Sequence, residues 1–203
     1  GRTDPGSADA VRRLVGRMRQ SVDLLVGVEA ALQADRALLV EAGSRLAMII
    51  STETDLARLR VTAGIWELYA QPRGADSRPG LDRLADVNFF AYERLAEMAE
   101  ANAALERLVA RIPGIREPAG LAGLEAEFET ALNLARDRSQ FMLSETSRRE
   151  AGLQLQRLSA GLGSEGLVAR RMAALSAQRD LGRLAAQLDR ELDLLIAEAQ
   201  LGR

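Results

Sequence analysis

Three residue types that carry much of protein chemistry are absent from this chain. It has no cysteine and no histidine, and all 27 of its basic residues are arginine, so it has no lysine. Without cysteine there is no disulfide or thiolate chemistry. Without histidine the chain lacks the commonest general base and metal ligand. The absence of lysine removes Schiff-base chemistry and the lysine of a phosphate-binding loop. We therefore expect a non-catalytic chain that holds no metal and no cofactor.

Aromatic residues and long apolar runs are also scarce. Aromatics are 3% of the 203 residues, and the net charge is only −2, with acids and arginines interspersed. No basic face for nucleic acid is therefore expected. No run approaches the roughly 20 apolar residues that cross a membrane, and we expect no signal peptide within these residues. Because the chain begins with glycine, we expect it to be part of a longer protein whose membrane segments lie outside it.

The residues that are abundant favour helices. Alanine, leucine, arginine and glutamate dominate, and no alternating β-branched run appears, so the fold class is predicted to be all-α. In the first helical segment, about residues 9–69, apolar residues recur every seven positions, which returns nearly to the same face of a helix. One row is Val11, Met18, Leu25, Leu32, Leu39 and Leu46, and the row beside it is Val15, Val22, Glu29, Arg36, Gly43 and Ile50.

A polar run, residues 51–55, interrupts this pattern. Thr52 and Asp55 have the spacing of a capping box. The first row would continue through Glu53 and Arg60, which are charged. A new apolar frame starts here, with Leu56, Leu59, Ala63 and Trp66. Two interpretations stay open: a register shift within one helix, or a turn between two helices.

Proline and glycine mark the later boundaries. A loop is predicted at 70–80, a heptad-rich helix at 81–112, a turn at 113–118, and a third helix from about 119. That helix breaks either at 144–150, which brings both chain ends together, or at the glycines of 161–166, which separates them unless the first helix also breaks. A last helix follows at 167–201. The predicted architecture is an elongated antiparallel bundle of four to six long helices, in one module or two stacked modules. Residues 1–8 are a lead-in, and 9–203 form a single domain.

Candidate binding residues lie near the 70–80 loop and in the third helix. The loop brings Trp66 close to Asn88 and Tyr92, either as a small core that closes the bundle end or as a ligand pocket or partner-docking tip. Arg136 and Arg138 either aim cationic donors at an anionic ligand or form a solvated face. These five residues are the ligand-binding candidates. Asn88 and a second seam residue, Asn102, are also predicted to fix helix register.

The long first helix, the polar run 51–55, the later hairpins and the leucine-rich last helix together resemble a known kind of domain. The pattern is similar to the helical sensor domains of TorS-like hybrid sensor kinases and of chemoreceptors with a helical bimodular ligand domain. The resemblance implies a periplasmic domain of an inner-membrane protein. It also implies that a small ligand or a periplasmic binding protein is bound, and that helix shifts carry the signal to the membrane. We expect a homodimer whose only link to the membrane lies outside this chain. The alternative is a soluble cytoplasmic helical scaffold or adaptor protein.

Overall fold

The chain folds into helices throughout the part that can be described. A computed structural model describes residues 5–72, 74, 76–162 and 165–201, and within them there is no strand, which confirms the all-α class. The elements are α1 (Pro5–Tyr69), α2 (Arg78–Arg83), the π-helix η1 (Leu84–Phe89), α3 (Phe90–Arg111), the 3₁₀ turns η2 (Ile112–Gly114) and η3 (Pro118–Gly120), α4 (Leu124–Ser139), α5 (Glu145–Leu162) and α6 (Leu167–Leu201).

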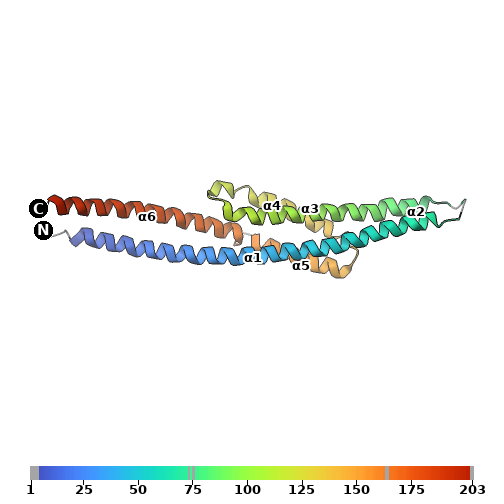
Figure 1. The fold of residues 1–203 in the computed structure, drawn as a ribbon, viewed down its shortest axis with the longest axis horizontal. Helices are drawn as coiled ribbons and strands as arrows, with labels where there is room; N and C mark the ends of the chain where they lie inside the picture. The colour runs from blue at the N-terminus through green and yellow to red at the C-terminus, as the bar shows by residue number, and fades with distance from the viewer. Residues whose placement is uncertain (1–4, 73, 75, 163–164, 202–203) are drawn as a thin grey trace.

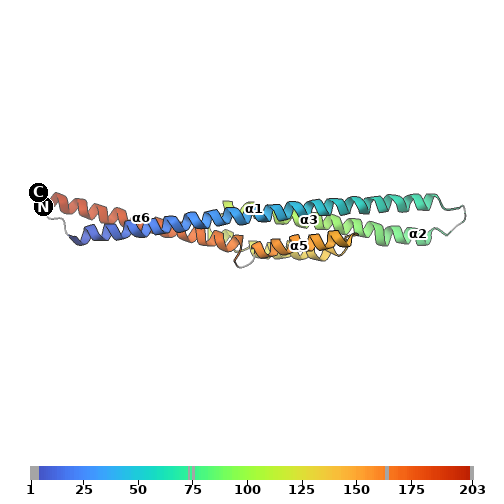
Figure 2. The same cartoon turned by 90° about the horizontal axis from the view of Figure 1, so that it is seen from below.

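Helix α1 runs the whole length of a narrow rod (Figures 1 and 2). Its 65 residues span about 98 Å at 1.5 Å per residue. The six residues of α2, the six of η1 and the 22 of α3 return along its second half, and the 35 residues of α6 lie along its first half. Helices α4 and α5 form a short hairpin against the middle.

This layout creates three sections with different numbers of helices. We call the end where α1 begins and α6 finishes the terminal end, and the end where α1 passes into α2 the hairpin end. Among the described residues, α1 and α6 alone lie side by side at the terminal end, and α1 and the α2–η1–α3 segment alone at the hairpin end (Figure 1). The middle section alone has four helices: α1, α3, α4 and α5.

The buried core follows from this arrangement. Of the first predicted row, Leu32, Leu39 and Leu46 are buried, whereas Val11, Met18 and Leu25 at the two-helix terminal end are only partly covered. In α3 and the following η2, the residues of the predicted heptad rows that lie in the middle section are also buried, namely Leu95, Met98, Asn102, Leu105, Val109 and Ile112. Burial therefore depends on how many helices surround a position, and not only on its place in the heptad.

Both interpretations of the polar run 51–55 were wrong. Helix α1 is unbroken, and its buried face continues without a register shift through Glu53 and Ala57. The predicted new frame instead faces solvent, since Leu59 and Trp66 are 63% and 69% exposed. A glutamate is buried at Glu53 because it meets backbone donors there, which are described below.

Two breaks in the second half were predicted as alternatives, and the structure has a turn close to each of them. The first turn lies at 140–144, earlier than the predicted 144–150, because residues 145–150 already belong to α5. The chain turns between α4 and α5 and again before α6, while α1 stays intact. Helix α4 runs toward the hairpin end and α5 runs back over a similar length, so the two displacements cancel. The start of α1 and the end of α6 therefore lie together at the terminal end (Figures 1 and 2). Helix α1 begins at Pro5, inside the predicted lead-in 1–8, and residues 1–4 lie outside the described part. The third helix begins at Leu124, later than predicted, because Pro118 opens a 3₁₀ turn there.

The four-helix section should carry most of the stability. Leu46→Ala removes a side chain that is 0% exposed, so we expect the free energy of unfolding to fall by about 2–5 kcal/mol. Leu24→Ala in the same helix, at a position 60% exposed, should change it by less than about 0.5 kcal/mol. Urea denaturation of both variants tests this. Equal losses would contradict the placement of the core.

Candidate functional site

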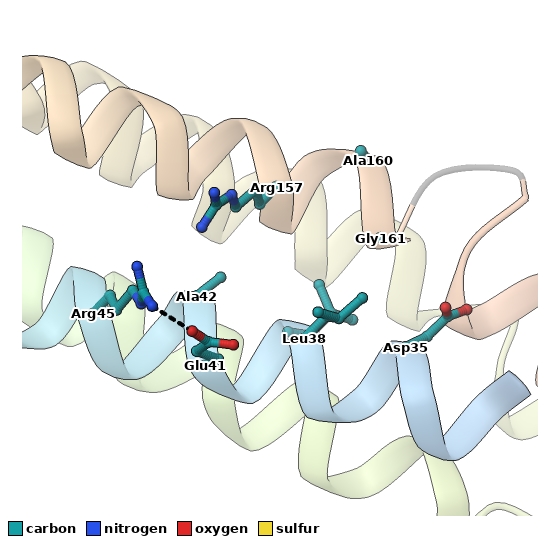
Figure 3. A pocket seen from close by; sticks show the side chains of 9 residues that line it. Asp35, Leu38, Glu41, Ala42, Arg45, Arg157, Ala160 and Gly161 are labelled. Carbon is teal, nitrogen blue, oxygen red and sulfur yellow. Dashed lines mark hydrogen bonds and ion pairs between the residues drawn. The ribbon is translucent and has the colours of Figure 1, made fainter. Parts of the chain in front are cut away.

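A groove lies between the middle of α1 and the C-terminal half of α5 (Figure 3). Its volume is about 620 Å³, and its apolar lining comes from Leu38, Leu39, Ala42, Ala160 and Gly161. Gly161 permits the close approach of the two helices, because a Cβ there would lie 2.5 Å from Cδ2 of Leu39. Leu38 remains 65% exposed, so part of the apolar floor faces solvent.

The charged side chains around this groove already have partners. Arg45 pairs with Glu41 at 2.5 Å within α1, as Figure 3 shows. On the opposite wall, Arg157 of α5 donates a hydrogen bond to Oε1 of Gln154 at 3.3 Å. Asp35 pairs with Arg170 of α6, also at 2.5 Å. An apolar centre with a charged rim is the anatomy of a protein-docking surface, whereas a small polar ligand needs convergent free donors.

The structure brings the aromatic candidates to the hairpin end but does not pack them into a core. Trp66 and its neighbour Tyr69 are 69% and 81% exposed, and Tyr92 of α3 is also exposed. Asn88 is half-buried, and its Nδ2 donates a hydrogen bond to the carbonyl of Arg60 at 3.3 Å. Asn88 therefore contacts α1 at Arg60, whereas Trp66 faces solvent, and the predicted small aromatic core does not form.

The two candidate arginines of α4 have different surroundings. Arg136 is exposed, whereas Arg138 donates a hydrogen bond to Glu97 of α3, which also pairs with Arg94 at 2.6 Å. The hydrogen bond from Arg138, followed by that from Arg94, lowers the pKa of Glu97 below its ordinary value. The guanidinium of Arg94 also lies 4.5 Å from the centre of the Phe90 ring. Arg138 thus joins α4 to α3 in this structure and is already engaged by a carboxylate.

Sequence reasoning missed the role of Glu53. This residue is 0% exposed, and its Oε2 accepts hydrogen bonds from the backbone N–H groups of Leu143 (2.5 Å) and Ser144 (3.2 Å). Those groups lie just before α5, where backbone donors have no helical partner and the helix dipole favours an anion. The available signal was a glutamate in a row of leucines, which marks a buried polar contact as well as a break.

Two further buried polar residues connect distant elements. Asn102 of α3 donates from Nδ2 to the carbonyl of Gly43 in α1 at 3.2 Å, as expected for an asparagine that fixes helix register. Arg171 of α6 donates to the carbonyl of Ile115 at 2.8 and 3.0 Å and to Glu29 at 3.3 Å. These contacts tie α3 and α6 to fixed positions along α1.

Neither a metal centre nor a membrane span occurs in the described ranges. No group of acidic side chains there is arranged to hold a metal ion. Within the same residues, no helix combines the length and the hydropathy needed to cross a membrane.

Comparison with known proteins identifies a shared fold. No protein-family model and no curated protein matches the sequence. The chain is similar to the solved structure of the TorS sensor domain–TorT complex in the presence of TMAO, with a TM-score of 0.81 and 12% sequence identity. The match covers 94% of this chain and 69% of that one. The chain therefore has the fold of a TorS-like sensor domain, as the resemblance predicted.

The buried carboxylate of Glu53 should contribute more to the free energy of unfolding than the exposed carboxylate of Glu41. Glu53→Ala leaves two backbone donors without their charged acceptor, and we expect a loss of about 3 kcal/mol in the free energy of unfolding. Glu53→Gln keeps an acceptor oxygen and should cost less. Glu41→Ala breaks an exposed pair and should cost at most about 1 kcal/mol. A Glu53→Ala loss no larger than that of Glu41→Ala, measured in urea, would refute this role.

Proposed function

We propose that this chain is the extracytoplasmic sensor domain of a membrane receptor, either a histidine kinase or a chemoreceptor. The observation that carries the proposal is that the start of α1 and the end of α6 lie side by side at one end of a rod (Figure 1). Segments that continue from both helices could then enter one membrane together. An unbroken α1 would connect that membrane to the hairpin end about 98 Å away.

The sensor would respond to a bound partner by a change in helix packing. The solved structure with the same fold is a complex of a sensor domain with TorT. By analogy, the partner here would be a periplasmic binding protein, and the groove between α1 and α5 has the apolar floor and charged rim that suit it. Docking that favours one packing of α1 against α5 would shift α1 and α6 at the terminal end.

The terminal end also has an apolar surface that suits a homodimer. In α1, Val15, Val22 and Val26 are exposed, and in α6 so are Leu192 and Ile196. In α1 they follow the partly covered Val11 or Met18 by four or eight positions, and in α6 they follow the half-buried Leu188 by four and eight positions. At about 100° per residue, each stripe is therefore rotated by about 40–80° from the residues that face the other helix, in the same rotational sense on both helices. Since the two helices run antiparallel, both stripes face the same side of the pair.

A second copy would cover that surface. Two α1–α6 pairs that meet through these stripes form a four-helix bundle, which is a stable way to bury an apolar helix face. The proposed dimer would thus supply at the terminal end the neighbours that α3, α4 and α5 supply in the middle section. It would also place the four helix ends of the dimer close together at the membrane.

Sedimentation analysis tests the dimer. We expect the wild-type chain to sediment as a dimer and Val22→Glu to sediment as a monomer with unchanged helical content, because the new charge faces the partner copy. Leu24→Glu, an exposed leucine on the other side of α1, is the matched control and should remain a dimer. A monomeric wild-type chain would refute the proposal.

The location can be tested because the chain has no cysteine. Ser51→Cys places one thiol in this chain, on the exposed face of α1. The variant is made in the full-length protein in its native cells, and the unsubstituted protein gives the background labelling. We expect a membrane-impermeant maleimide to label it in intact cells whose outer membrane has been permeabilised. Labelling only after lysis would instead support the cytoplasmic scaffold.

A further inference from the structure

The hairpin end contains a second pocket whose lining differs from that of the α1–α5 groove. It encloses about 330 Å³ between the last turns of α1, the following turn and the α2–η1 segment. This volume lies at the lower end of the range for small-molecule sites. Side chains of both charges line it together with two amides: Arg60, Glu67, Gln71, Asp76, Arg83 and Asn88.

The backbone is shaped to form this pocket. The segment that faces α1 is the six-residue π-helix η1, an uncommon element that often occurs at functional sites. Asn88 of η1 donates to the Arg60 carbonyl, and Gly64 leaves space for this contact. A Cβ on Gly64 would lie 3.2 Å from Nδ2 of Asn88 and 3.1 Å from Cδ1 of Leu84. The hairpin is therefore held at a fixed distance from α1 on one side of the pocket.

One polar atom in the lining lacks a partner. Oε1 of Gln71 is buried and, among the described residues, accepts no hydrogen bond. A buried acceptor without a donor costs free energy, and a ligand N–H group would satisfy it. Glu67 and Asp76 add negative charge to the same lining, so the ligand group that binds Gln71 is best an amine with a positive charge.

The arginines require the opposite charge. Arg60 and Arg83 line the pocket, are exposed, and make no ion pair with another described residue. A guanidinium binds a carboxylate through two parallel hydrogen bonds. A ligand that is only cationic or only anionic would leave one set of charged side chains unmatched. A ligand with both groups a few ångströms apart would match both sets.

We propose that this pocket binds a small zwitterion with a free amine and a free carboxylate, that is, an amino acid. This inference rests on the proposed sensory function and specifies a ligand for it. Binding would join α1 to the α2–η1 segment, and it would change the packing at the end of the rod opposite the membrane.

The test uses the whole chain and the twenty common L-amino acids as probes, by thermal shift and then by isothermal titration calorimetry. We expect at least one amino acid to raise the Tm. Its N-acetyl and carboxamide derivatives should each bind at least about tenfold more weakly, because each removes one charge that the lining matches. No shift with any of the twenty at millimolar concentration would overturn the proposal, and so would equal binding of either derivative.

Variants locate the site. Gln71→Leu and Arg83→Leu should each weaken binding at least about tenfold, with circular dichroism as the check on folding. The matched controls Gln33→Leu and Arg58→Leu change exposed residues of α1 outside the pocket and should bind as the wild type does. Binding that survives both pocket substitutions would place the ligand elsewhere and overturn the proposal. Labelling of Ser51→Cys does not depend on this pocket, so loss of the ligand with labelling retained would leave the sensor function standing.

Discussion

The long apolar seam of α1 is the constraint on which the rest of the structure depends. A single helix of 65 residues cannot bury its own apolar face, so α2, η1, α3, α5 and α6 each cover part of it, and α4 packs outside them on α3 and α5. Helix α6 covers the first half of α1, and the α2–η1–α3 segment covers the second half. In the middle section, α5 also packs on α1, and α4 packs on α3 and α5. The unequal cover explains why the buried apolar side chains of α1 lie between Leu32 and Ala57, and why both ends of the rod expose apolar side chains.

Buried polar contacts fix where along α1 each partner lies. Leucine and alanine alone would allow a helix to slip by a heptad at modest cost, because one apolar layer resembles the next. Glu53, Asn102 and Arg171 each bond to a backbone group on a different element, and a one-heptad slip would leave these buried groups without partners. A signal carried by a shift of one helix along another would have to break or distort these hydrogen bonds.

The three sections of the rod suggest a division of roles within the proposed sensor. The four-helix middle contains most of the buried core of α1, and it holds the groove that we propose as the docking site of a partner. The hairpin end has few neighbours, a π-helix and a mixed-charge pocket, so a ligand could alter its packing at low cost. The terminal end is a thin helix pair whose apolar stripes a second copy would complete. The continuous α1 passes through all three and could transmit a shift between them.

The sequence by itself determined the helical class, the elongated shape and most helix boundaries, because heptad spacing, prolines and glycines act locally. It also placed Asn102 in a seam and Asn88 near α1. Only the tertiary structure decided that α1 continues past Ser51, that Trp66 faces solvent, and that Arg138 binds Glu97. A charged residue such as Glu53 looks like a break until the N–H donors of Leu143 and Ser144, 90 residues away, are brought to it. Whether a polar residue is buried depends on partners that are distant in the chain, and local periodicity carries no information about them.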